Sequence, residues 1–195
     1  MSSTSLSSPP RSSRPLASSL AVVAGLLRLL PHPPNFTPVG ALGLFAGARL
    51  AGGRAFALPL LVMAVSDVLL SLIFGYPLWH AGLPWVYASI LINVGIGRWL
   101  RHTESPWLIG SASLLASAQF FVLTNFGVWA TGGLYPPTVA GLMTCYTLAI
   151  PFFGWTLLGD VCYSAVFFGA HAWLSRTQFP AERVKEMSLS YDDVG

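Results

Sequence analysis

Four polar side chains stand inside long apolar runs of this sequence: Asp67, Asn93, Asp160 and Arg28. Asp67, for example, lies at the middle of PLLVMAVSDVLLSLIFGY (59–76). A charged or amide group in such surroundings binds a solute or an ion, relays protons, or holds neighbouring segments together. These four residues are therefore the first candidates for a functional site, and the elements that carry them decide whether they meet.

The chain is too apolar for a soluble globule. Of its 195 residues, 54% are hydrophobic and only 9% are charged, and the mean hydropathy is +0.64. So little polar surface cannot coat a fold that faces water. We predict an integral membrane protein built of helices, because the alternating pattern of membrane β-strands is absent and helices then satisfy the backbone in lipid.

Seven apolar segments are bounded by Pro, Gly or charged residues: 16–30, 36–50, 56–76, 85–100, 107–124, 138–153 and 155–174. Residues 1–15 are rich in Ser and Pro and are predicted to be a disordered tail, and residues 176–195 are predicted to be a charged cytoplasmic tail. A single transmembrane domain would span 16–175. A cleaved signal peptide is the alternative for 11–30, but Arg28 inside the run and the lack of a small-residue cleavage site favour an uncleaved first span.

The basic residues indicate which ends of the segments face the cytoplasm, where Lys and Arg are retained. Nine of the ten occur in the N-terminal tail, the second and fourth connections and the C-terminal tail, whereas the connections 31–35, 75–84 and 125–137 contain none. We therefore predict that the protein lies in the cytoplasmic (inner) membrane with both termini cytoplasmic. This topology requires an even number of crossings.

Because seven segments cannot give an even number, one of them must stay on one side. Residues 138–153 follow two prolines and reach Pro151, so we predict a partial or re-entrant helix there, on the outer side. The six transmembrane helices are then 16–30, 36–50, 56–76, 85–101, 107–124 and 152–174. The predicted fold class is an all-α bundle of these six helices plus the partial helix. The alternative is seven true spans, which would place three basic residues on the wrong face.

The six-span topology places Asp67, Asn93 and Asp160 at one depth, about 12 to 14 Å below the outer boundary at 1.5 Å per residue. A carboxylate that faces lipid costs about 2.5 kcal/mol or more. Both acids should therefore face the interior of the bundle or a wet cavity. The alternative is that they only cap or bridge helices. Arg28 could reach the outer interface or lean inward as a counter-charge to either acid.

Polar and aromatic residues of the outer connections would lie above this layer: Asn35, Tyr76, Trp79, His80, Trp85, Tyr87, Asn125, Trp129 and Tyr135. We predict ligand contacts at Asn35, Asn125, Trp129 and Tyr135, because aromatic rings stack on flat ligands while amides orient them. An interfacial aromatic belt would use the same residue types. The segment NFGVW (125–129) favours a cavity, because a broken segment at lipid depth must be buried in protein or line a cavity.

Small residues on the first two spans predict close helix packing. Ala17 and Ala21 lie one turn apart, and Gly43 and Gly47 form a GxxxG pair. Such faces pack within a bundle by default, or they dock onto a partner protein.

No motif for metal, nucleotide or hydrolytic chemistry occurs in the sequence. The four His are scattered, and the metalloprotease, serine-hydrolase, Walker and dinucleotide-binding patterns are absent. We therefore expect no metal, no cofactor and no enzymatic activity. The pI near 9.1 reflects arginines on the cytoplasmic side and no nucleic-acid surface.

Three stretches carry a resemblance to known proteins: PHPPNFTPVGALGLFAGARL, PLLVMAVSDVLLSLIFGYP, and FFVLTNFGVWATGGLYPPTVAGLMTCYTLAIPFF with GWTLLGDVCYSAVFFG. Over residues 20–174 the chain resembles a family of small bacterial integral membrane proteins without an established activity. More distantly, it is similar to the substrate-binding S components of energy-coupling-factor vitamin transporters. That similarity implies six helices, a ligand near the outer face, a gating loop at 31–38, and docking of Ala17 and Ala21 onto a transmembrane coupling subunit with ATPases.

The favoured function is a membrane-embedded subunit that binds a small vitamin- or metabolite-like molecule for a transporter, with Asp67, Asn93 and Asp160 as the floor of its pocket. One alternative is a self-sufficient secondary carrier or channel that uses the two acids. The other is a structural or assembly protein. Transport by the favoured route would require an ATP-driven partner, because no motif of this chain binds nucleotide.

Overall fold

The computed structural model describes residues 13–178, and this part of the chain forms six helices and no strand. The helices are α1 (Ser13–Leu27), α2 (Val39–Arg49), α3 (Arg54–Phe74), α4 (Leu83–Arg98), α5 (Pro106–Thr131) and α6 (Val139–Gln178). The all-α prediction is confirmed for these residues. Most of the two predicted tails lies outside the described part, although α1 already begins at Ser13 and α6 continues to Gln178.

Proline and glycine set several of the helix ends. Both α4 and α5 have Pro in their first two positions, where the missing N–H costs no intrahelical hydrogen bond. α3 ends at Gly75, whose φ of 73° is the left-handed conformation that glycine adopts without strain. The predicted spans 56–76 and 85–101 therefore become α3 and α4 with slightly shifted ends.

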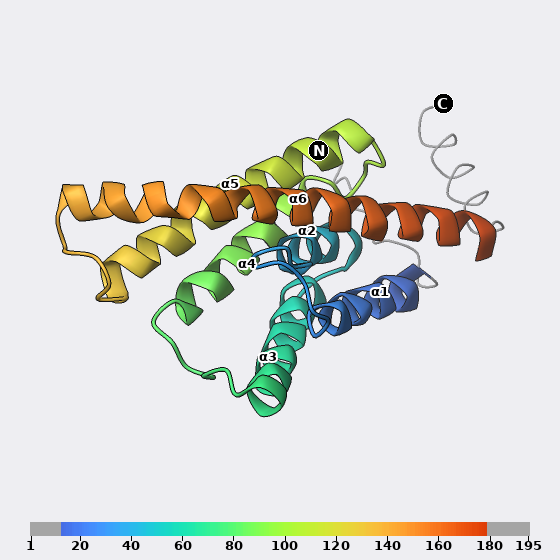
Figure 1. The fold of residues 1–195 in the computed structure, drawn as a ribbon. Helices are drawn as coiled ribbons and strands as arrows, with labels where there is room; N and C mark the ends of the chain where they lie inside the picture. The colour runs from blue at the N-terminus through green and yellow to red at the C-terminus, as the bar shows by residue number, and fades with distance from the viewer. Residues whose placement is uncertain (1–12, 179–195) are drawn as a thin grey trace, which may run out of the picture.

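The short helix α2 forms the centre of the bundle. Every residue of α2 except Arg49 is buried, and the helix contacts each of the other five (Figure 1). A Cβ atom at Gly47 would collide with the backbone oxygen of Val94, and one at Gly97 would collide with that of Leu44. The GxxxG pair therefore packs inside the bundle, where glycine lets the backbones of α2 and α4 approach closely.

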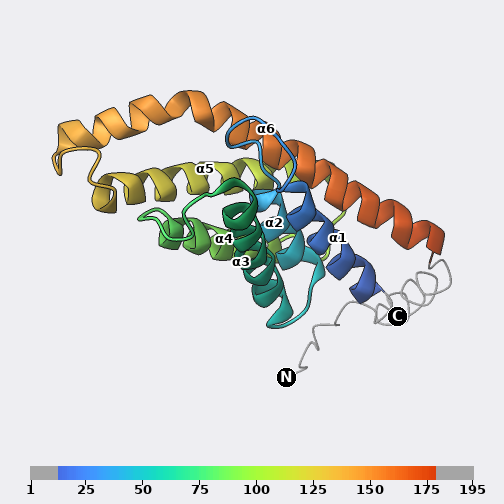
Figure 2. The ribbon, with the colours of Figure 1, turned by 60° about the horizontal axis from the view of Figure 1, so that its bottom comes forward.

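Helix α6 is continuous over 40 residues and runs along the whole bundle (Figures 1 and 2). The segments 138–153 and 152–174 are both parts of it, so the prediction of a separate re-entrant helix is wrong. Pro151 lies inside the helix, where a proline removes one backbone hydrogen bond and crowds the preceding turn. Figure 2 shows α6 bent in its first half. Helix α6 therefore continues past Pro151, and the proline does not end it.

Three helices are long and apolar enough to cross a membrane: Arg54–Phe74, Pro106–Thr131 and Val139–Thr177. Two others, Leu16–Leu27 and Val39–Arg49, are apolar but shorter. Large apolar side chains are exposed on the long helices, as at Leu72 (77%), Trp107 (86%) and Val139 (78%). Surface of this kind marks contact with lipid or with another protein, and the three long helices indicate membrane association. The six-span topology stays a prediction.

The connections that carry the arginines meet at one end of the bundle. Arg49, at the end of α2, donates a hydrogen bond of 2.9 Å to the backbone oxygen of Thr103, in the connection after α4. In the opposite direction, Arg98 donates one of 3.1 Å to the backbone oxygen of Gly52, in the connection before α3. Figure 2 shows the start of α1 and the end of α6 at this same end. The arrangement agrees with the predicted topology, while the cytoplasmic location of this end stays a prediction.

Candidate functional site

Asp67 lies at the centre of a charged group of side chains that joins three helices. Its Oδ1 atom is 2.6 Å from Nη1 of Arg28, just beyond the end of α1. Its Oδ2 atom accepts a hydrogen bond of 2.8 Å from the hydroxyl of Tyr87 on α4. Arg28 also donates to Oγ of Ser66 (2.7 Å), which in turn donates to the backbone oxygen of Met63 (2.9 Å). We call Arg28, Ser66, Asp67 and Tyr87 the charged cluster.

The ion pair of the charged cluster is largely buried. The side chains of Arg28 and Asp67 are 18% and 17% exposed. In surroundings of low polarity the two charges attract each other more strongly than they would in water, and their hydrogen bonds offset the cost of placing them there. Of the alternatives for Arg28, the structure has the inward orientation, with Asp67 as the counter-charge. Part of each charged side chain remains exposed.

Asp160 belongs to a second group and binds the start of α2. Its Oδ2 atom accepts a hydrogen bond of 2.6 Å from Oγ of Ser117 on α5, and its carboxyl group accepts another from the backbone N–H of Ala41. The N-cap residue of α2 is Pro38, which provides no side-chain cap, and the carboxyl group occupies the space that a Cβ at Gly40 would need. Asp160 is 2% exposed and therefore caps α2 from a neighbouring helix.

Asn93 belongs to a third group, between α4 and α5. Its Oδ1 atom accepts a hydrogen bond of 2.7 Å from Nε2 of Gln119, which also donates to the backbone oxygen of Ser89 (3.1 Å). Among the described residues, Nδ2 of Asn93, Oε1 of Gln119 and Oγ of Ser89 are buried without a hydrogen-bond partner in the protein. Buried polar atoms of this kind usually bind water or a ligand. This group therefore has the capacity for further polar contacts.

The structure divides the predicted polar layer into three groups. Asp67 forms an ion pair with Arg28 and accepts a hydrogen bond from Tyr87 on α4. Asp160 instead accepts hydrogen bonds from α2 and α5. Within residues 13–178, no recorded hydrogen bond or ion pair links the two carboxyl groups to a common partner. The physical reason is that α2 begins inside the bundle, where its backbone N–H groups need an acceptor. The capping alternative therefore describes Asp160.

The predicted outer contacts lie in two connections and near the end of α5. Nε1 of Trp129 donates to the backbone oxygen of Pro136 (3.1 Å), and Nδ2 of Asn125 bonds within its own helix, α5 (2.8 Å). Tyr135 is half-buried, and Asn35 is exposed with a φ of 65°. In the described part of the chain, none of these four residues has a recorded hydrogen bond to the three groups. A role of these four residues in one site with the two acids stays a prediction.

The segment NFGVW is helical, which corrects the prediction of a broken segment at 125–129. Helix α5 continues to Thr131, and a Cβ atom at Gly127 would collide with the ring of Trp85. Nε1 of Trp85 also donates a hydrogen bond of 3.2 Å to Oγ1 of Thr131. The glycine in this segment therefore makes room for a tryptophan of the neighbouring helix, which explains its presence without a break in α5.

The small-residue face of α1 packs inside the bundle. Ala17 and Ala21 are 0% exposed, and Ala24 is 1% exposed. All three belong to the main apolar core, which also contains most of α2. Internal packing is the default for such faces. Ala17 and Ala21 therefore offer no free surface for the predicted docking of a coupling subunit.

Sequence reasoning missed Ser117 and Gln119, and it placed Tyr87 only among the outer aromatic residues. Two signals could have found the missed residues. Ser113 and Ser117 are four residues apart, so they share one face of α5, and Gln119 is the one amide in the apolar run 107–124.

For metal chemistry, no three His, Cys, Asp or Glu side chains of the described residues lie close enough together to hold an ion.

Comparison with known proteins identifies a family but no activity. A model described as a family of unknown function (DUF6580) matches residues 10–182, and the chain belongs to this family. No curated protein matches the chain, and no solved structure matches it. Membership in a family without an assigned activity is thus confirmed, and the similarity to vitamin-transporter subunits stays a prediction.

Proposed function

For this member of a family without an assigned function, we propose a role as a membrane-embedded subunit that binds a small vitamin- or metabolite-like molecule for transport. The proposed binding site is the charged cluster of Arg28, Ser66, Asp67 and Tyr87. The observation that carries the proposal is an ion pair, 18% and 17% exposed, in an otherwise apolar helix environment. Ionisable residues in such a position are costly, and a functional site is their default interpretation.

The charged cluster offers both donors and acceptors to a ligand. The guanidinium of Arg28 can bind a carboxylate or phosphate through paired N–H groups, and the carboxylate of Asp67 can accept from an amine or hydroxyl. The hydroxyl of Tyr87 can do either. A polar ligand would exchange the present contacts for its own. The proposed ligand therefore carries an anionic group and a hydrogen-bond donor, together with an apolar part that the surrounding side chains can cover.

Transport through such a subunit requires an energised partner. The chain has no nucleotide-binding motif, so the proposal includes a transmembrane coupling subunit with ATPases. Because Ala17 and Ala21 are buried, this partner would contact the exposed face of α1. Val22, Val23 and Leu26 are 48%, 44% and 58% exposed there.

Thermal unfolding of the purified full-length protein in detergent, with and without a panel of vitamins and polar metabolites, tests the proposal. The variants are Asp67→Asn and Arg28→Gln. Asp160→Asn is the matched control, because it removes a carboxyl group that lies outside the charged cluster. We expect at least one compound to stabilise the wild type and Asp160→Asn, and to leave Asp67→Asn and Arg28→Gln unchanged.

Two outcomes would count against binding at the charged cluster. The first is that no compound stabilises the wild type and that mass spectrometry of the denatured protein finds no retained small molecule. The second is that Asp160→Asn loses the response together with Asp67→Asn. The response would then reflect the integrity of the fold and not a contact with the ligand.

A structural or assembly role is the second candidate, and the capping of α2 by Asp160 favours it. In that case the polar groups serve only to join helices, as polar side chains in membrane bundles often do. Asp67→Asn and Asp160→Asn would then both lower stability, and no compound would restore it. The carrier alternative has less support, because the two acids have separate partners.

A further inference from the structure

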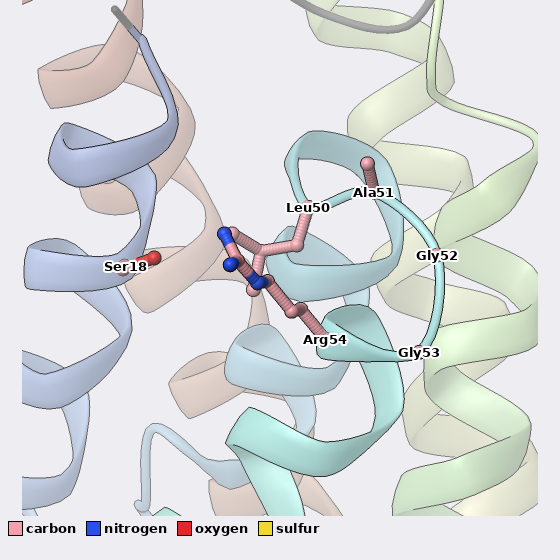
Figure 3. Close-up of a pocket in the computed structure, with 6 residues that line it drawn as sticks. All are labelled: Ser18, Leu50, Ala51, Gly52, Gly53 and Arg54. Carbon is pink, nitrogen blue, oxygen red and sulfur yellow. The ribbon is translucent and has the colours of Figure 1, made fainter. Parts of the chain in front are cut away.

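A cavity of about 290 Å³ lies at the end of the bundle where the connections with arginines meet. Its lining residues are Ser18, Leu50, Ala51, Gly52, Gly53 and Arg54. Figure 3 shows the side chain of Arg54 extending from the start of α3 toward α1, on the side of the Ser18 hydroxyl. Because the apolar span of α3 begins at Arg54, the cavity lies at the boundary of the apolar region.

Arg54 differs from the other arginines whose side chains the structure describes. Two of these form ion pairs and three donate to backbone oxygens: Arg28, Arg176, Arg49, Arg98 and Arg101. For Arg54, which is exposed, the described part of the chain provides no recorded hydrogen bond and no ion pair. A guanidinium that no acid of the described residues pairs with, beside a cavity, is available to an anion from outside.

The connection that lines the cavity is fixed from the opposite side. Arg98 donates to the backbone oxygen of Gly52 (3.1 Å), and Arg101 donates to that of Leu50 (3.4 Å). These hydrogen bonds engage carbonyl oxygens that would otherwise repel an anion. Apart from the glycine and its two chain neighbours, no residue has an atom within 4 Å of the position of a Cβ at Gly52 or Gly53. The backbone is therefore open to a ligand at this point.

The start of α3 adds a further positive contribution. The helix has no side-chain cap and no acidic residue in its first turn. The positive end of its dipole is therefore not compensated by a carboxylate of the same helix. Together with the side chain of Arg54, this makes the cavity a favourable place for a group with negative charge.

We propose that this cavity binds a phosphate group, and that an anionic phospholipid supplies it. A headgroup at this position could place its acyl chains along the exposed apolar side chains of α3, such as Leu61 (61%) and Val65 (50%). Basic pockets between helices at the membrane surface recognise anionic headgroups in this way. Inorganic phosphate offers the same oxygen atoms, so the test must separate the two sources.

Thermal unfolding of the full-length protein in lipid nanodiscs provides the test. The wild type, Arg54→Gln, Arg54→Lys and Arg176→Gln are reconstituted in phosphatidylcholine alone and in mixtures with increasing phosphatidylglycerol. The same proteins are titrated in detergent with inorganic phosphate. Arg176→Gln is the matched control, because it removes one positive charge outside the cavity. A second variant, Ala51→Glu, introduces a negative charge into the cavity and leaves Arg54 in place, so that it tests anion binding independently of Arg54.

We expect phosphatidylglycerol to stabilise the wild type, Arg54→Lys and Arg176→Gln. In Arg54→Gln and in Ala51→Glu the apparent affinity for phosphatidylglycerol should fall about fivefold or more, as expected for the loss of one arginine contact with an anionic lipid. No response to inorganic phosphate would assign the lipid as the source. A saturable response to inorganic phosphate that Arg54→Gln abolishes would assign free phosphate instead. Equal responses of Arg54→Gln and the wild type, or equal losses in Arg54→Gln and Arg176→Gln, would overturn the proposal.

Discussion

Stepwise removal of the ion pair between Arg28 and Asp67 is the most direct test of the charged cluster. In Asp67→Asn, the guanidinium loses the carboxylate that lies 2.6 Å away and keeps its hydrogen bond of 2.7 Å to Ser66. Removing one partner of a fully buried ion pair costs about 3 to 5 kcal/mol. Because these side chains are 18% and 17% exposed, surrounding solvent screens part of the loss, and we expect about 2 to 3 kcal/mol.

The double variant Arg28→Gln/Asp67→Asn should be more stable than the single variants suggest. Two neutral amides leave no uncompensated charge, so we expect the double variant to lose only about 1 to 2 kcal/mol. If Arg28→Gln alone lowers the free energy of unfolding by about 2 kcal/mol, the two single losses together exceed the loss in the double variant by about 3 kcal/mol. This difference is the interaction energy between the two sites. Tyr87→Phe removes only the hydroxyl that donates to Asp67 and should cost about 1.5 kcal/mol.

The assay is reversible unfolding in mixed micelles with increasing sodium dodecyl sulfate, followed by the fluorescence of the seven Trp residues. Arg176→Gln is the control, because it breaks an ion pair with Glu104 whose side chains are 59% and 44% exposed, and it should cost at most about 1 kcal/mol. Additive losses in Arg28→Gln and Asp67→Asn, with no recovery in the double variant, would refute the reasoning. The two charges would then contribute independently to stability.

Two further substitutions test the centre of the bundle and its arginine-rich end. Gly47→Ala should destabilise the protein by about 1 to 3 kcal/mol, because its Cβ would collide with the backbone oxygen of Val94. In the same unfolding assay, Gly95→Ala should be neutral or stabilising, since outside the adjacent backbone of its own helix no atom lies within 4 Å of the added Cβ. Equal losses of stability in Gly47→Ala and Gly95→Ala would contradict this packing. Arg49→Gln should lower the free energy of unfolding by about 1.5 to 3 kcal/mol. It should also speed amide hydrogen exchange in the connection after α4, because the guanidinium donates a hydrogen bond to the backbone oxygen of Thr103 there. Unchanged exchange would mean that Arg49 does not hold this connection in place.

The helices could be predicted well from the sequence where strong breakers border an apolar run. The segment predicted at 56–76 is α3, and Gly75 ends it in a left-handed conformation. Pro151 marks the limit of this reasoning, because a proline inside a long apolar helix can bend it without ending it. Local sequence does not decide between these outcomes. The support of the neighbouring helix decides, and α6 packs along α5.

The candidate site could be predicted only in part. The scarcity of charge singled out Asp67 and Arg28, because an unpaired charge in lipid is costly, but it left the outer interface and Asp160 as alternatives for Arg28. Counting residues from the outer end of each predicted span predicted the depth of Asn93 and Asp160, but it could not predict the direction in which their side chains point. Rotation about the helix axis and the crossing of neighbouring helices set that direction. The sequence therefore could not predict that Asp160 would serve the start of α2.

The sequence by itself, through its apolar composition and the length of its apolar runs, indicated helices and association with a membrane, because long apolar runs satisfy their backbone groups in lipid as helices. The tertiary structure decided which polar groups meet. It placed the shortest apolar helix, α2, at the centre, where glycine lets α4 approach and where the start of the helix needs an acceptor. The hydrophobic pattern that predicts a helix lies within one segment of the chain. The hydrogen bond between Ser117 and Asp160 instead depends on how two helices that are far apart in the sequence are positioned.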